Sequence, residues 1–201
     1  TLPNNITTGP MPGIAQNFNG SSDRLTVPAT TSVKGLAQYT ISAWMRTTSV
    51  AGTHTLYEEQ QGAAATSRLK FGLETNNFTL RIRDVDGSAI RTAIQPAVVI
   101  ATGTWYHVVA IYDATADVHR MIIDGTSYSN ALTVASVSNT APTGTSNIGA
   151  RPTGAEWWSG DADELRISNT FRSLNWGKTE YNNQSSPSTF YSVATQETYP
   201  P

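Results

Sequence analysis

Two arginines, Arg81 and Arg83, stand two residues apart in the alternating segment 78–83. Positions i and i+2 of an extended strand share one face, so both guanidinium groups would point to the same side. Two such forks can bind a carboxylate or a sulfate group through paired hydrogen bonds, as an acidic polysaccharide would offer. The alternative is a solvated sheet face on which the arginines pair with Glu74 or Asp84.

A pair of tryptophans, Trp157 and Trp158, lies in a Gly-, Pro- and Thr-rich stretch after Arg151. Adjacent residues of an extended chain face opposite ways, so one ring can be buried while the other is exposed. Sugar rings stack their apolar C–H faces on exposed aromatic rings, and neighbouring polar groups bind the hydroxyls. One of these two rings is therefore a candidate sugar contact, and the alternative is a ring that contacts no ligand.

The patterns expected of an enzyme are missing from the sequence. A retaining glycosidase needs two carboxyl groups on one face, ~5–5.5 Å apart. Glu58 and Glu59 are adjacent and would face opposite ways, whereas Asp161 and Asp163 can share a face. The three histidines have no metal-ligand spacing, and no Gly-x-Ser-x-Gly motif is present. We expect a protein that is not an enzyme, with a glycoside hydrolase or lyase as the least favoured alternative.

The composition narrows the fold and the partners. Charged residues make up 14% of the 201 residues, against ~25% in typical globular domains, and 15 Gly and 10 Pro favour many turns. A net charge of −2 without a basic cluster excludes nucleic acid as a partner. No apolar run approaches the ~20 residues of a membrane helix, so we expect no membrane insertion. The absence of cysteine excludes disulfides and thiolate metal sites.

Period-two patterns indicate β-strands along most of the chain. Alternating segments and fully apolar segments are both present, at residues 40–45, 69–73, 78–83, 106–112, 120–123 and 164–167. The dipeptides Asp86-Gly87 and Asp124-Gly125 are typical of tight hairpin turns. One helix is expected over residues 173–181, with Ser173 as its N-cap. About twelve short strands predict an antiparallel sandwich or jelly roll.

Six segments occur in an order that resembles a LamG-type domain of the concanavalin A-like lectin/glucanase superfamily. They are residues 18–23, 40–45, 102–109, 122–125, 147–149 and 160–169. The likeness spans about residues 14–190, and segment 179–193 resembles LamG domains of large multidomain prokaryotic surface or secreted proteins. It implies an all-β, concanavalin A-like jelly-roll sandwich of two antiparallel sheets. We expect one such domain over residues 1–201, with linker stubs at 1–12 and 194–201.

The resemblance also implies a function. It favours a non-catalytic, lectin-like carbohydrate-binding or adhesion module of a larger extracellular protein, either secreted or on the cell surface. The expected partners are a polysaccharide or glycoconjugate and the other domains of the parent protein. A structural spacer domain without a small-molecule ligand is the alternative.

Two candidate sites follow from the resemblance. The family often has an aromatic residue at the position of Trp158, which leaves Trp157 as the exposed ring, and Trp157, Arg81 and Arg83 are the candidate ligand-binding residues. Related domains often hold a structural calcium ion on the convex side. The ligands here would be Asp163 and backbone carbonyls of Asn19 and a residue near Gly35, since calcium prefers oxygen ligands. The alternative is that Asp163 caps a turn through backbone N–H groups.

Overall fold

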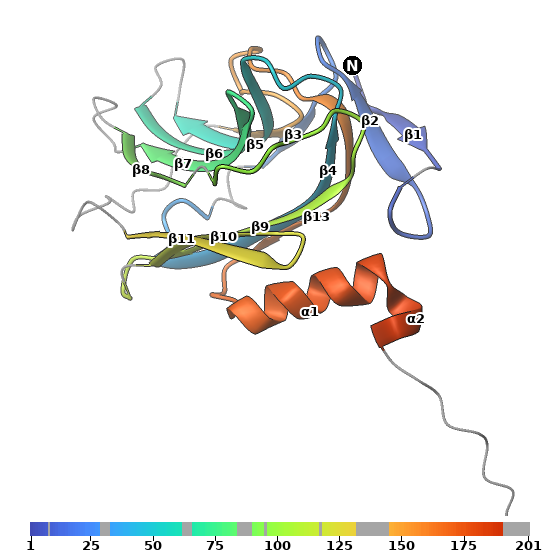
Figure 1. Cartoon of the computed structure of the whole chain (residues 1–201). Helices are drawn as coiled ribbons and strands as arrows, with labels where there is room; N and C mark the ends of the chain where they lie inside the picture. The colour runs from blue at the N-terminus through green and yellow to red at the C-terminus, as the bar shows by residue number, and fades with distance from the viewer. Residues whose placement is uncertain are drawn as a thin grey trace, which may run out of the picture.

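The computed structural model of the chain describes residues 1–7, 9–28, 33–61, 66–83, 90–94, 96–116, 118–131 and 145–190. Two antiparallel sheets pack face to face, and a helix lies against the outer side of one of them (Figure 1). This arrangement confirms the expected all-β jelly-roll sandwich.

The larger sheet has seven strands, in the spatial order β1 (Asn4–Ile6), β2 (Ala15–Asn19), β13 (Ser159–Ser168), β4 (Gln38–Thr47), β9 (Tyr106–Asp113), β10 (Val118–Ile123) and β11 (Thr126–Ala131). The smaller sheet has six strands, in the order β3 (Leu25–Val27), β12 (Ser146–Ile148), β5 (Thr53–Gln61), β6 (Thr66–Glu74), β7 (Asn77–Arg83) and β8 (Ile90–Ile94). Two helices follow the last strand, α1 (Leu174–Ser185) and α2 (Pro187–Phe190).

The main hydrophobic core fills the space between the sheets. Alternate residues of β6 and β7 face it, which explains the period of two in the sequence. The core also contains the stacked rings of Tyr39 and Tyr112, whose centroids are 4.9 Å apart, and the fully buried Trp158. Buried core residues on the two strands are Leu69, Phe71, Leu73, Phe78, Leu80 and Ile82.

Helix α1 covers the outer side of β4, β9 and β10. The Ser173 side chain accepts a hydrogen bond from the Trp176 amide at 3.1 Å, as expected of the N-cap. A second apolar cluster of Val109, Ile111 and Ile122 packs beneath Trp176 and its neighbours. These strands are therefore buried on both faces, which explains their continuous apolar sequences.

Several local features agree with the sequence and one differs. Asp124 and Gly125, with φ of 47° and 76°, form the two-residue turn between β10 and β11, since a type I′ turn needs positive φ at both positions. Residues 4–6, expected in a linker stub, instead form β1 against β2. Asp84, Asp86-Gly87 and segment 194–201 lie outside the described residues, and the limits of the domain stay a prediction. Within the described part of the chain, neither helix has the length and apolarity needed to cross a membrane.

Candidate functional site: a charged row on the six-stranded sheet

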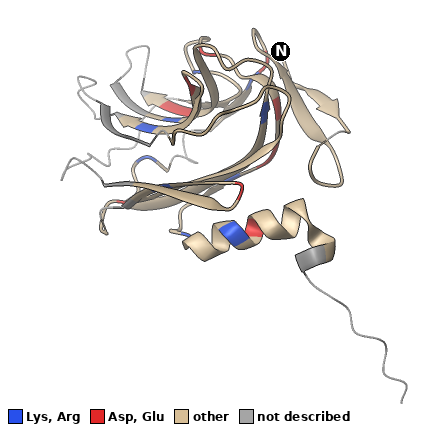
Figure 2. Ribbon diagram, in the orientation of Figure 1, with Lys and Arg blue, Asp and Glu red and all other residues tan. Residues whose placement is uncertain are grey.

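Charged side chains line the outer face of the six-stranded sheet, which is the face turned away from the core. The strand registers place Asn147, Glu58, Lys70 and Arg81 side by side across β12, β5, β6 and β7. Figure 2 shows acidic and basic residues next to one another on this sheet. Glu58 and Lys70 are buried, with 0% and 1% of their surface exposed, although they point outward. Something must therefore cover this face and neutralise its charges.

Lys70 is the centre of the row. Its ammonium group forms ion pairs with Glu74, at 3.0 Å, and with Glu156 from the segment before β13. Glu74 in turn pairs with Arg81 on the neighbouring strand β7. Each of these buried or partly buried charges thus has a partner of opposite sign, the condition under which charges persist away from water.

A loop formed by residues 149–158, called the covering loop below, lies over this row. Its Arg151 pairs with Glu156 at 3.3 Å and lies 3.7 Å from Glu58, while its Nε donates to Gln60 at 3.0 Å. Counting Arg81, Lys70 and Arg151 against Glu58, Glu74 and Glu156, the described charges on this face balance. The described part of this face is therefore polar and close to neutral in net charge.

Backbone hydrogen bonds attach the covering loop to β5. The Gly149 amide donates to the Leu56 carbonyl at 2.7 Å, and the Thr55 amide donates to the Glu156 carbonyl at 2.8 Å. Gly149 has a φ of 90°, and a Cβ there would lie 2.4 Å from the ring of Phe18, so only glycine fits this position. The loop is thereby fixed to the sheet before any ligand binds.

The two tryptophans differ in burial, as the alternation allowed and the family resemblance assigned. Trp158 is fully buried and donates through Nε1 to the Asp161 carbonyl at 3.3 Å. Trp157 is half-buried, and the guanidinium carbon of Arg24 lies 5.8 Å from the centre of its ring. Trp157 is therefore a partly accessible ring next to Glu156, the residue that joins the covering loop to Lys70.

Arg81 lies on the charged face as predicted, paired with Glu74, which is the alternative considered from the sequence. The side chain of Arg83 lies outside the described residues. The structure brings Arg81 and the covering loop together through Glu74, Lys70 and Glu156. Sequence reasoning missed Lys70, Arg151 and Glu156. Only Lys70 carried a signal, because its spacing to Glu74 puts both side chains on one face of a strand.

The three residues expected to bind calcium do not meet. Asn19 pairs with Ser159, whereas Asp163 lies four residues farther along β13, roughly 13 Å away at ~3.3 Å per residue. Gly35 lies in the turn that begins at Val33. The Val33 amide donates to the Glu59 carboxylate on β5 of the six-stranded sheet at 2.9 Å, whereas Asn19 and Asp163 belong to the seven-stranded sheet. Ligands of one calcium ion lie within ~2.6 Å of it, so these three residues do not share an ion.

Asp163 has the alternative role considered for it. Its Oδ1 accepts the amide of Glu164 at 2.8 Å, and the Met11 amide also donates to this carboxylate. Burial raises the pKa of Asp163, partly offset by these hydrogen bonds. Among the residues that the structure describes, no group of three or more His, Cys, Asp or Glu side chains is placed to hold a metal ion. The calcium ion stays a prediction.

The comparison with known families agrees with this geometry. The profile of the concanavalin A-like lectin/glucanases superfamily matches residues 19–176. The chain belongs to this family, of the laminin G type, as the ordered segments of the sequence predicted. A search of the curated proteins gives no match.

Solved structures share the fold at low sequence identity. A carbohydrate-binding module, the CBM40 of Ruminococcus gnavus IT-sialidase bound to α2,3-sialyllactose, superposes with a TM-score of 0.64 and 15% identity over 80% of this chain and 97% of that chain. Domain 4 of AbnA, an extracellular arabinanase of Geobacillus stearothermophilus, was solved in complex with arabinotriose. It superposes with a TM-score of 0.61 and 19% identity, over 83% of this chain and 75% of that chain. A pentraxin of Limulus polyphemus superposes with a TM-score of 0.60 and 15% identity, over 82% of this chain and 80% of that chain. The fold is therefore the lectin-like fold of carbohydrate-binding modules.

Proposed function

We propose that this domain is a non-catalytic carbohydrate-binding module, and that it binds a polysaccharide or glycoconjugate at the covering loop. The observation that carries the proposal is the half-buried ring of Trp157 on a loop that hydrogen bonds and an ion pair attach to a polar sheet face. Aromatic rings beside fixed polar groups suit the apolar and hydroxyl faces of a sugar ring. A sugar would stack on the face of Trp157 opposite Arg24.

The charge balance favours a neutral sugar over an acidic one. Each described cation on the sheet face, including Arg81, already contacts a carboxylate. A uronic acid or sulfate group would have to compete with Glu74 for Arg81 and would leave this buried carboxylate with Lys70 alone, which is unfavourable. Hydroxyl groups can share these charged groups without separating them.

The same pairs argue against hydrolysis. Glu74 and Glu156 both contact the Lys70 ammonium, so they approach the spacing that a retaining glycosidase needs. The ammonium, however, lies between the two carboxylates, where the glycosidic oxygen of a substrate would have to lie. We infer a binding role, in which these groups order the covering loop.

We further propose that the module belongs to a larger secreted or cell-surface protein whose other domains it accompanies. Support comes from the fold it shares with the domain of an extracellular arabinanase. A spacer domain without a ligand is the second candidate, supported by the mutual pairing of the charged side chains.

A glycan array that includes neutral, uronic-acid and sulfated polysaccharides tests the proposal, run with calcium and with EDTA. We expect weak binding to neutral glycans, with affinities in the micromolar to millimolar range. Selective binding of acidic glycans would overturn the neutral-sugar assignment. Binding of no glycan would support the spacer instead.

A further inference from the structure

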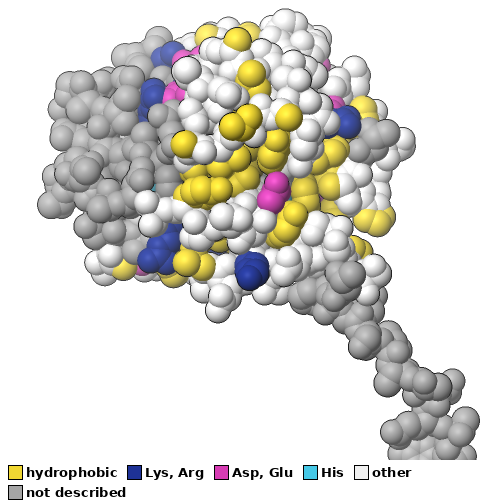
Figure 3. Space-filling view, viewed as in Figure 1, with side chains coloured by type: hydrophobic (Ala, Val, Ile, Leu, Met, Phe, Trp, Pro, Cys, Tyr) yellow, Lys and Arg dark blue, Asp and Glu magenta, His cyan; other side chains and the backbone are white. Residues whose placement is uncertain are grey.

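A groove opens between the two sheets along the edge formed by β2 and β13 on one side and β3 and β12 on the other. Its volume is about 430 Å³, within the ~300–1,000 Å³ usual for small-molecule sites. Figure 3 shows hydrophobic side chains gathered along this hollow with an acidic side chain among them. The apolar lining consists of Ile14, Phe18, Leu25, Ile148, Ala162 and Leu165.

A β-bulge in β13 shapes the groove. The register between β13 and β4 shifts between Asp163 and Arg166, and Glu164 has a φ of 51°. A bulge bends its strand and redirects its side chains. On the opposite side, β3 and β12 have only three residues each, so the smaller sheet covers little of this edge. Ile14, which lines the groove just before β2, is 56% exposed.

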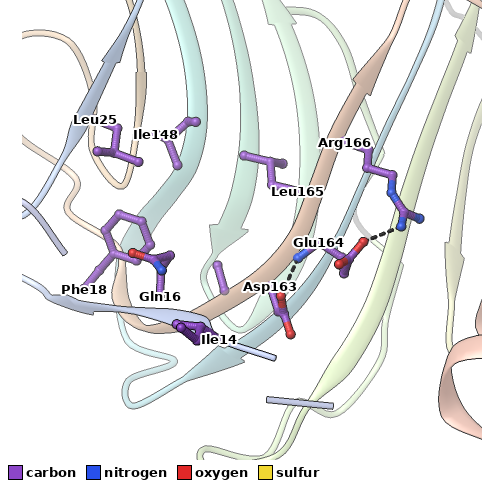
Figure 4. A pocket seen from close by; sticks show the side chains of 10 residues that line it. Ile14, Gln16, Phe18, Leu25, Ile148, Asp163, Glu164, Leu165 and Arg166 are labelled. Carbon is purple, nitrogen blue, oxygen red and sulfur yellow. Dashed lines mark hydrogen bonds and ion pairs between the residues drawn. The ribbon is translucent and has the colours of Figure 1, made fainter. Parts of the chain in front are cut away.

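The charged side chains of the groove are concentrated on one side, whereas the amide side chain of Gln16 lies beside Phe18 on the other. Figure 4 shows Asp163, Glu164 and Arg166 opposite Phe18 and the two aliphatic residues of the smaller sheet. The groove is therefore amphipathic across its width, with one mainly apolar wall, which includes Gln16, and one charged wall. A ligand that fits it needs an apolar body and one polar group at its side.

The charged wall favours a cation. The Arg166 guanidinium is shared by two carboxylates, because it pairs with Glu164 and with Glu180 of helix α1. Asp163 receives backbone N–H groups, and none of the ion pairs among the described residues includes it. The lining thus carries one more carboxylate than cations, so an occupant with a positive charge complements it.

We propose that this groove binds a small amphipathic amine, with its apolar body against Leu25, Ile148 and Leu165 and its ammonium group at Asp163. Burial of the apolar body supplies the affinity, and the carboxylate selects the amine over a neutral or anionic group. The site lies between the sheets, whereas the proposed sugar site lies on the outer face of the smaller sheet. The two proposals concern different sites, so a result against one does not count against the other.

Three probes that share one apolar body test the proposal: 4-phenylbutylamine, 4-phenylbutanol and 4-phenylbutyrate. The protein is titrated with each in EDTA-containing buffer, and methyl NMR shifts of Ile14, Leu25, Ile148 and Leu165 report binding. We expect all three probes to shift these signals, with the amine binding most tightly and the carboxylate least. An absence of shifts in these methyl groups at millimolar amine, or tighter binding of the carboxylate, would overturn the proposal.

Two variants and a control separate the apolar and charged contributions. Asp163→Asn keeps an oxygen that can accept the Glu164 amide but removes the charge, so the preference for amine over alcohol should fall about fivefold. Ile14→Ser should weaken all three probes alike. Val99→Ser is the matched control, because Val99 is 87% exposed and outside the groove lining. An unchanged preference in Asp163→Asn would reject the assignment of the ammonium group to Asp163.

Discussion

Lys70 of β6 and Glu156 of the covering loop form an ion pair that joins two segments far apart in the sequence. Because Lys70 also binds Glu74, one buried ammonium group links the middle of the six-stranded sheet to the loop that carries Trp157. The position of the candidate sugar-binding ring therefore depends on a charge at the centre of the sheet.

Replacing Lys70 by methionine should destabilise the protein by about 2–3 kcal/mol. The apolar chain of methionine fills similar space, but Glu74 and Glu156 lose their shared partner in a buried setting. The loss stays below the ~3–5 kcal/mol of a fully unpaired charge, since Arg81 and Arg151 still contact these carboxylates. Urea unfolding at neutral pH measures the change in free energy.

Lys178→Met is the control for this variant, because Lys178 is exposed on helix α1 and its loss should change stability by no more than ~0.5 kcal/mol. A double-mutant cycle of Lys70→Met with Glu156→Gln measures the coupling between loop and sheet directly. Equal effects of the two lysine substitutions would contradict the role given to Lys70.

Local patterns in the sequence predicted the strands and the Ser173 cap, because each depends on residues close together in the chain, whereas the family resemblance assigned the buried ring to Trp158. Alternation showed that Arg81 lies on the same face of its strand as Arg83, two residues on. It did not show which strands lie beside that strand. Lys70 and Glu156 come into contact because the topology places the covering loop, which precedes β13, over β5 and β6. The groove was unpredicted for the same reason, since it needs the bulge in β13 and the short β3 and β12.

Acidification should destabilise the fold through His119. Burial in the core lowers the pKa of this imidazole to about 3, against 6.5 for an accessible histidine. Below about pH 6.5 the unfolded chain binds a proton that the folded protein excludes. Above that pH, the contribution of His119 to the free energy of unfolding is fully present. Below it, the free energy of unfolding falls by about 1.4 kcal/mol per pH unit until the pH approaches the pKa of about 3 in the folded protein.

The contribution of His119 is isolated by comparison with His119→Gln. Burial raises the pKa values of Asp124 and Asp163, which acts in the opposite direction in both proteins and cancels in the difference. Between neutral pH and about pH 4.5, the wild type should lose roughly 2–3 kcal/mol more than the variant. Parallel stability curves for the two proteins would show that His119 does not titrate as described.

Calcium should stabilise the protein if Asp163 supplies a ligand to an ion that binds the folded state. An ion bound to the folded state alone adds about 2.7 kcal/mol at a hundredfold excess over its Kd. Melting temperatures in EDTA and in millimolar calcium measure this, and Asp163→Asn should abolish any increase. Identical melting temperatures for the wild type, with no metal found by elemental analysis, would leave Asp163 as an acceptor of backbone N–H groups alone.

Replacing Trp157 by alanine should lower the affinity for a bound glycan by roughly 1–3 kcal/mol, the range expected for an aromatic ring that stacks on a sugar. The fold should persist, because this ring is half-buried at the surface while Trp158 fills the core. Trp105→Ala is the matched control. Trp105 is also half-buried, and the guanidinium carbon of Arg46 lies 4.9 Å from the centre of its ring, as that of Arg24 lies over Trp157. Isothermal titration with a glycan found on the array gives both affinities. A large loss in Trp157→Ala with none in Trp105→Ala assigns the site to the covering loop, whereas full affinity in Trp157→Ala removes this ring from it.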